Sequence, residues 1–461
     1  MNASADLRTV PFEAWRSRCA AGCLPLGRHY EDGDTRLADL RFDPSSAADR
    51  LWELLLSEEE RLAAAREDGA RLVGAMKDLG SVPVMAYALP GVVAFYPDGA
   101  WWTPCLMRRG DGLFAVADAL GMDDSFCPVR AMLGAFANGQ HFPIPDLLTC
   151  SVGAVCDDFS AIAQRVEGLG HPVLWWEMPY RREPDAGEAA MTLPGGMRAP
   201  RYQVECVTAE LTRVGEALSA LAGCALTDAR LAEGIRVANR VRAVLRDLRD
   251  AVFTAPRAPL PALEELIAEM LIIHFCSDRE ATEAVLDDLL AEVRRRVSAG
   301  QGYGRADDAR IFWVNPVADL RAMALVEACG ARVCGTDFLF THALEPIPES
   351  LPPFEALAAS ALADPMVGTS AQRAERIVKE MRRLGAEALV ISRIPGASHC
   401  AHEGARIAEI VDRQLGVPCL DVEIPSLSDA FAAALSTRLE ALVEAVRAAR
   451  SRTRGEGDVM V

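Results

Sequence analysis

The sequence has 461 residues, which at roughly 150 residues per domain is enough for about three domains, or for two large α/β domains with an insert. Hydrophobic residues make up 51% of the chain and charged residues 25%, which excludes a disordered chain and a fibre. The 48 basic and 66 acidic side chains give a formal net charge of −18, so nucleic acids and anionic membranes are unfavourable partners. The N-terminal residues lack the apolar run of a signal peptide, and we therefore expect a cytoplasmic protein.

The hydrophobic pattern predicts five regions in chain order. Residues 1–80 form an N-terminal helical region, with residues 51–79 expected as one long helix. Residues 81–200 alternate apolar and amphipathic runs; the expected strands include VPVMAY, GVVAFY, DLLTCSVGAV and PVLWWEM. Residues 201–305 are a helical segment, residues 306–450 resume the alternation, and residues 451–461 are a disordered tail. Because strand–helix–strand spacing is typical of parallel sheets, the predicted fold class is α/β, with two Rossmann/flavodoxin-like parallel-sheet domains linked by a helical segment.

A repeated sequence pattern relates the two α/β domains. Residues 170–179 and 416–425 share the pattern G-x-P-x-L-x-x-E-x-P, and each segment follows an apolar strand, a cysteine-bearing loop and a helix. Cys156 and Cys400 occupy the equivalent loops. The repeated pattern indicates two structural repeats, each with a cysteine at the carboxyl end of a strand, where open parallel sheets bind ligands.

Three cysteines share one predicted setting at the start of a helix. Cys127, in Phe126-Cys127-Pro128, joins Cys156 and Cys400 in this group. The free N–H groups and positive dipole end of a helix lower the pKa of a thiol, and the thiolate is the form that binds metal. We therefore predict one site where the two domains face each other, and three thiolates suit a [4Fe–4S] cluster with one open iron. For each cysteine the alternative is a small buried core residue.

Other ligand sets remain open. His399, Cys400 and His402 with Cys127 and Cys156 have the donor types of a zinc site. Cys105 and Cys150 lie near enough in the sequence to be substitute ligands, and Cys334 ends a predicted strand in the second α/β domain. The chain has no G-x-x-x-x-G-K-[ST] loop, so any ATP is expected to be hydrolysed by a partner.

Several short motifs occur in a specific order along the chain. They are Phe126-Cys127-Pro128-Val129-Arg130, Pro143-Ile144-Pro145-Asp146-Leu147-Leu148, Cys156-Asp157-Asp158, Asp337-Phe338-Leu339-Phe340, Asp364-Pro365-Met366-Val367-Gly368 and the segment around Cys400. In their order and spacing, over roughly residues 79–450, the chain resembles the iron–sulfur subunits of the 2-hydroxyacyl-CoA dehydratase and benzoyl-CoA reductase superfamily.

The resemblance implies a cofactor, partners and a reaction. It implies that Cys127, Cys156 and Cys400 hold a [4Fe–4S] cluster, and that the chain pairs with a homologous second subunit or a second copy. It further implies an ATP-hydrolysing iron–sulfur activator that delivers an electron to an acyl-CoA or aryl-CoA thioester. The resulting ketyl radical anion permits either dehydration of 2-hydroxyacyl-CoA or benzoyl-CoA-type ring reduction.

One segment departs from the family pattern. Substrate-binding dehydratase subunits carry a P-E-E-L-type segment before the first cluster cysteine, whereas this chain has Tyr96-Pro97-Asp98-Gly99-Ala100. The remaining carboxylate, Asp98, is the candidate catalytic residue for handling substrate or protons, and the alternative is a Pro-Asp-Gly turn. The departure favours a benzoyl-CoA-reductase-like subunit or a partner that relays electrons. A non-catalytic relay or scaffold homologue and a zinc-dependent hydrolase are the alternative functions.

Overall fold

The computed structural model describes most of the chain. The described residues are 6–19, 40–78, 80–98, 110–139, 141–274, 277–317, 319–338, 341–397, 402–424 and 430–457. No helix in these ranges combines the length and hydropathy that crossing a membrane requires.

The first α/β unit is built on a four-stranded parallel sheet with the order β4-β3-β5-β6. Its strands are β3 (Arg71–Met76), β4 (Val92–Phe95), β5 (Leu147–Gly153) and β6 (Val173–Met178). The connecting helices are α5 (Val82–Tyr87), α7 (Gly110–Ala119), η2 (Pro128–Arg130), α8 (Ala131–Asn138) and α9 (Asp157–Gly168). The near-continuous apolar strands match a sheet that is covered on both faces.

The second α/β unit repeats this design, with a parallel sheet in the order β10-β9-β11-β12. Its strands are β9 (Ala309–Val314), β10 (Ala331–Asp337), β11 (Ala388–Arg393) and β12 (Cys419–Glu423). Its helices are α14 (Arg321–Ala328), η4 (Thr341–Leu344), α15 (Pro353–Leu362), η5 (Pro365–Val367), α16 (Ser370–Leu384), α18 (Gly404–Leu415) and α19 (Phe431–Gly457). The α/β fold with two flavodoxin-like sheets is therefore confirmed, because both sheets have the flavodoxin-like strand order.

The repeated sequence pattern corresponds to the same backbone features in both units. Gly170 and Gly416 both follow a helix and have positive φ angles of 93° and 62°. In each unit the carbonyl of the next proline then accepts a hydrogen bond from a leucine N–H at 3.0 Å, from Leu148 to Pro172 and from Leu389 to Pro418. The shared pattern thus sets the entry of β6 and of β12 in the same way.

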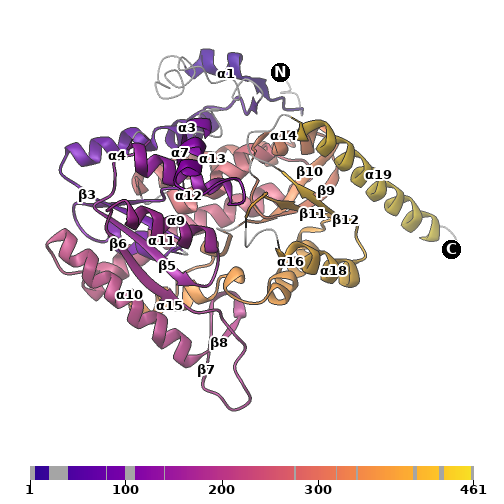
Figure 1. Cartoon of the computed structure of the whole chain (residues 1–461). Coiled ribbons are helices and arrows are strands. Elements are labelled where there is room, and N and C mark those ends of the chain that lie inside the picture. Colours follow the sequence, from indigo (N-terminus) through magenta and orange to yellow (C-terminus); the bar gives the residue numbers. More distant parts are fainter. Residues whose placement is uncertain are drawn as a thin grey trace.

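A helical segment joins the first α/β unit to the second and packs against both (Figure 1). It consists of α10 (Arg201–Ala222), α11 (Asp228–Thr254), α12 (Ala262–His274) and α13 (Arg279–Ser298). Helix α11 contacts α5 of the first unit and β10 of the second, and α10 contacts β6 and α15. A hairpin of β7 (Ala190–Thr192), η3 (Pro194–Gly196) and β8 (Arg198–Pro200) precedes α10, and α19 extends at the opposite side of the molecule (Figure 1).

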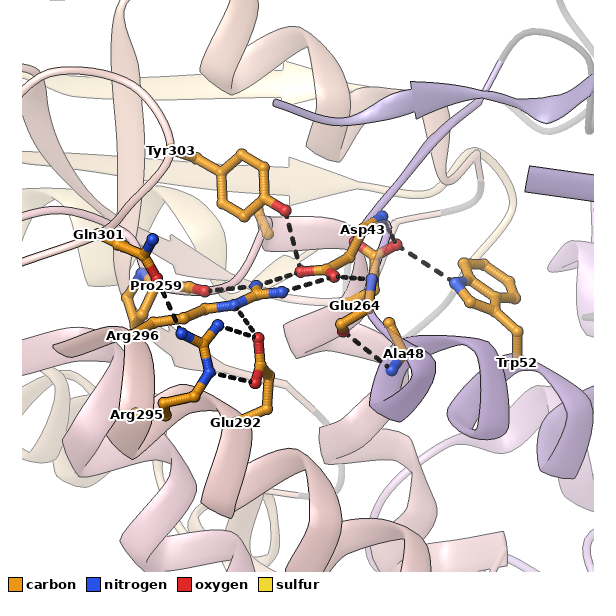
Figure 2. A network of polar contacts seen from close by, with 12 residues as sticks. Asp43, Ala48, Trp52, Pro259, Glu264, Glu292, Arg295, Arg296, Gln301 and Tyr303 are labelled. Atoms are coloured by element: carbon orange, nitrogen blue, oxygen red, sulfur yellow. Dashed lines mark hydrogen bonds and ion pairs between the residues drawn. The ribbon is translucent and has the colours of Figure 1, made fainter. Parts of the chain in front are cut away.

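The N-terminal region is anchored to the helical segment by a buried polar network (Figure 2). This region contains β1 (Val10–Pro11), α1 (Phe12–Cys19), β2 (Arg41–Phe42), α3 (Ser46–Leu56) and α4 (Glu58–Glu67). Asp43 is fully buried and pairs with both terminal nitrogens of Arg296, and the Tyr303 hydroxyl donates to it at 3.0 Å. Burial opposes the charge of Asp43, but Arg296 outweighs that effect and lowers its pKa. Glu264 accepts from the Asp43 N–H at 2.9 Å and from the Trp52 indole at 3.3 Å.

Two local predictions are wrong. Residues 51–79 are not one helix: α3 and α4 are separated at Ser57, and the chain then turns at Gly69, with φ +90°, into β3. VPVMAY is helix α5 instead of a strand, because Pro83 starts a helical turn and the Asp78 carboxylate accepts the N–H of Val82 at 2.7 Å. Helix α19 extends as far as Gly457, into the residues predicted as a tail.

Candidate functional site

The carboxyl ends of the two sheets carry the candidate site. In a flavodoxin-like sheet the strand order reverses beside the first strand, and ligands bind there. Lys77 and Asn315 directly follow the first strands, β3 and β9, and both have positive φ angles, 54° and 71°. Val155, after β5, has a φ of 78°. These are the described non-glycine residues in this conformation, and such backbone strain clusters at functional sites.

Cys127 lies at the start of η2, as predicted. Its backbone is extended, with φ −51° and ψ 142°, and its side chain is 8% exposed. Pro128 then supplies the first helical residue, because its fixed φ suits a helix start and its missing N–H needs no partner. Element η2 packs against α8 and α9, so the helix starts that carry Cys127 and Cys156 belong to one neighbourhood of the first unit.

Cys156 is the N-cap residue of α9 and is partly buried. Its thiol donates to the Asp158 carboxylate at 3.5 Å, and the nearby N–H groups of Phe159 and Asp158 favour the thiolate, as expected for a helix start. Burial is the larger effect, and together with the Asp158 carboxylate it raises the pKa of the Cys156 thiol to about 11. The prediction that the helix start lowers this pKa overall is therefore wrong for the protein without metal. A bound cation would reverse that balance, because it deprotonates a coordinating thiol.

A loop of the second unit reaches the Cys127 segment. Gly396 follows β11 and lies so close to Phe126 that an added Cβ would meet the Phe126 carbonyl oxygen at 2.4 Å and the Cys127 nitrogen at 3.1 Å. Ile394 and Ala397 of the same loop are buried in the apolar cluster that contains Cys127. Cys400 follows four residues after Gly396, but Cys400 and His399 lie outside the described residues. The chain leading to the third predicted ligand is thus docked on the first.

An arginine that the sequence analysis missed connects the second sheet to the Cys400 segment. Arg373 of α16 is fully buried and donates to Asp337 at 2.7 Å, to Glu403 at 2.7 Å and to Asn315 at 2.8 Å. Burial opposes its charge, but Asp337 and Glu403 outweigh that effect and raise the pKa of Arg373. Glu403 is three residues after Cys400, so this network fixes the start of α18 against the ends of β9 and β10.

Lys77 is the second residue that was missed. It is 8% exposed, and its Nζ donates to the Ser160 hydroxyl at 3.2 Å. Burial lowers the pKa of Lys77, while the negative charge available on Cys150, Cys156 and Asp157 favours the ammonium form. Its sequence signal was visible, because Lys77 is one of only two lysines in the chain and directly follows a strand.

Asp98 lies at the same edge of the first sheet, just beyond β4, and is partly buried. Beside it in the chain, Tyr96 donates to Asp78 at 2.6 Å. Asp78 is fully buried, and burial raises its pKa. Asp78 and Asp98 thus follow two neighbouring strands, β3 and β4, at the same edge of the sheet.

Within the described ranges no group of three or more His, Cys, Asp and Glu side chains is arranged to hold a metal ion. The predicted third ligand and the zinc alternative both require residues outside those ranges. Cys150 and Cys334 are fully buried inside β5 and β10, where burial raises the pKa of each thiol to about 12. These two positions are typical of core cysteines, and Cys105 also lies outside the described residues.

The fold and the site define a protein class: two flavodoxin-like units, the first of which carries Cys127 and Cys156 at helix starts on its ligand-binding edge. The model of one family, described as 2-hydroxyglutaryl-CoA dehydratase, D-component, matches residues 83–446. The chain belongs to this family and is a component of the dehydratase type. The resemblance inferred from the short motifs is thereby confirmed. No curated protein matches the chain.

Proposed function

We propose that the chain is the [4Fe–4S] subunit of an ATP-activator-dependent radical enzyme that acts on CoA thioesters. The supporting observation is the packing of the Gly396 loop on the backbone of Cys127, beside the helix that Cys156 begins. Family membership supports the thioester substrate, the partner subunit and the separate activator.

Cys127, Cys156 and Cys400 would hold the cluster, and the chemistry of the donor set fits it. Thiolates are the usual ligands of iron–sulfur clusters. The N–H groups at the start of α9 favour a thiolate at Cys156, which is the form that ligates iron. When bound, the cluster would supply an electron of low potential to the thioester.

The chain's own residues would control charge around this site. The Lys77 ammonium places a buried positive charge near Cys156, which favours anionic species at the carboxyl edge of the first sheet. Arg373 would hold the Cys400 segment in place through Glu403. Asp98 would handle substrate or a proton from the end of β4.

The experiment is reduction of the anaerobically purified chain by an ATP-dependent iron–sulfur activator, followed by electron paramagnetic resonance. We expect a reduced-cluster signal that requires ATP. Turnover with 2-hydroxyacyl-CoA thioesters would then show water loss, and turnover with benzoyl-CoA would show ring reduction. A chain that takes up no electron would contradict the proposal.

A second candidate is an electron-relay or scaffold homologue that does not touch substrate. The observation that favours it is the Asp98 segment, which has one acidic residue where substrate-binding subunits carry two. A relay subunit would be reduced by the activator but would turn over no thioester alone. An Asp98→Asn change would then leave turnover of the assembled enzyme unchanged.

A further inference from the structure

Lys77 is a buried cation at the edge of the first sheet where the proposed cluster site lies. It directly follows β3 and is 8% exposed. Its backbone φ of 54° is strained for a residue with a side chain, and such conformations persist where the surrounding structure enforces them. Burying an ammonium ion is unfavourable unless an opposite charge accompanies it. Lys77 therefore requires a source of negative charge nearby.

Two hydrogen bonds fix Lys77 between the neighbouring strand and helix. The Ser151 hydroxyl of β5 donates to the Lys77 carbonyl, and Lys77 Nζ donates to the Ser160 hydroxyl of α9 at 3.2 Å. Ser160 is four residues after Cys156, the N-cap residue of α9, and side chains with this spacing lie on one face of a helix. The ammonium group is therefore held on the side of α9 that carries Cys156, and Cys156 is among the groups whose negative charge acts on it.

Lys77 lacks a buried carboxylate partner. Among the residues that the structure describes, no carboxylate forms an ion pair with it. Burial raises the pKa of the nearby Cys150 thiol to about 12, which keeps that thiol neutral, and the nearby Asp157 is exposed to water, which weakens its charge. The buried Asp158 accepts from Cys156 instead, at 3.5 Å. Cys156 therefore remains as the position where a buried negative charge can balance Lys77.

We propose that Lys77 raises the reduction potential of the proposed cluster by stabilising the negative charge that reduction adds. This role rests on the proposed function. Reduction transfers one electron from the activator to the cluster, so the site gains one unit of negative charge and no bond forms or breaks. Net charge, hydrogen bonds to sulfur and solvent exposure set the potentials of iron–sulfur clusters. A nearby ammonium group therefore favours the reduced form.

The surroundings of Lys77 strengthen this effect. Met76, which precedes it, belongs to the same buried apolar cluster as Cys127, Cys150 and Ile162. Charges interact more strongly where apolar side chains exclude water. The start of α9 contributes positive partial charge in the same direction. Lys77 thus adds a full positive charge to the partial charges of the helix start.

The experiment is a redox titration of the anaerobically purified chain with a low-potential chemical reductant, followed by electron paramagnetic resonance and iron analysis. Lys77→Met removes the charge, Lys77→Gln removes it but keeps a hydrogen-bond donor, and Lys77→Arg keeps the charge. We expect a more negative reduction potential in the first two variants and a potential close to that of the unmodified chain in Lys77→Arg. Lys379→Met is the matched control, because the other lysine of the chain is exposed on α16 of the second unit.

The iron content separates a change of potential from a loss of the cluster. A more negative potential in a charge-removing variant that retains its iron supports the role of Lys77, provided that Lys77→Arg and Lys379→Met do not share the shift. Loss of iron from Lys77→Met and Lys77→Gln but not from Lys77→Arg also supports it, because the charge is then needed to hold the cluster.

Three results would overturn the role of Lys77. They are an unchanged potential in the charge-removing variants, the same shift in Lys379→Met, and loss of iron from all three Lys77 variants. Each of them leaves the proposed function intact, since the unmodified chain still holds a reducible cluster. A chain that binds no iron after anaerobic reconstitution contradicts the proposed function and the role of Lys77 together.

Discussion

Replacing Gly396 by alanine tests whether the loop that leads to Cys400 is docked on Cys127. The added Cβ would lie 2.4 Å from the Phe126 carbonyl oxygen, and the backbone φ of +78° is unfavourable for any residue with a side chain. The left-handed conformation costs about 1–2 kcal/mol. Overpacking adds about 1–3 kcal/mol. We therefore expect Gly396→Ala to reduce the free energy of unfolding by about 2–5 kcal/mol.

Gly416→Ala is the matched control, because Gly416 also has a positive φ, +62°, but an added Cβ there has no neighbour within 4 Å. Urea unfolding followed by tryptophan fluorescence gives both values. The control should lose only the conformational part, about 1–2 kcal/mol. Iron binding should fall in Gly396→Ala and stay unchanged in Gly416→Ala. Equal destabilisation of the two variants would refute the close contact between the loop and the Cys127 segment.

Three further predictions concern buried charges. Arg373→Met leaves the buried carboxylates around it unpaired and should lower the free energy of unfolding, measured in urea, by about 3–5 kcal/mol. Arg383→Met, which removes a partly exposed arginine, should lower it by about 1 kcal/mol or less. Similar losses in the two variants would contradict the central role of Arg373. Burial raises the pKa of Glu264 to about 8, so the folded protein keeps its proton and stability falls as pH rises from the ordinary carboxyl pKa to about 8. Glu264→Gln should remove that loss of stability, which is roughly 1.4 kcal/mol per pH unit. The variant should therefore be more stable than the unmodified chain at pH 8 but not at pH 4, as measured by urea unfolding at both pH values. The same pH dependence in both proteins would count against this reasoning. Lys77→Met removes a positive charge near Cys156. In the metal-free chain, the pH dependence of Cys156 alkylation, measured by peptide mapping, should therefore move to higher pH. An unchanged pH dependence would show that Lys77 does not influence the Cys156 thiol.

The sequence predicts the two sheets well because their strands are long apolar runs separated by amphipathic helices. It fails where local signals compete. All six side chains of α5 are buried, so no alternation separates this short helix from a strand. The boundary between α4 and β3 is hidden because only the turn around Gly69 interrupts a run of residues that favour helix.

The residues of the candidate site could likewise be predicted from the sequence only where the signal is local. The helix starts at Cys127 and Cys156 could be predicted because a cysteine before a proline or an acidic helix start is a local pattern, and both residues do begin helices. Arg373 was missed because its partners, Asp337 and Glu403, are 36 and 30 residues away and meet it only in the folded sheet. No local pattern distinguishes this arginine from the others on the surface.

The measurement that tests the central claim most directly is the iron and acid-labile sulfide content of the anaerobically purified chain. We predict about four irons per chain, lost in Cys127→Ser, Cys156→Ser and Cys400→Ser. The Cys206→Ser control, at an exposed position on α10, should retain them. A chain without iron after anaerobic reconstitution, or with zinc in its place, would contradict the assignment of these three cysteines to an iron–sulfur cluster.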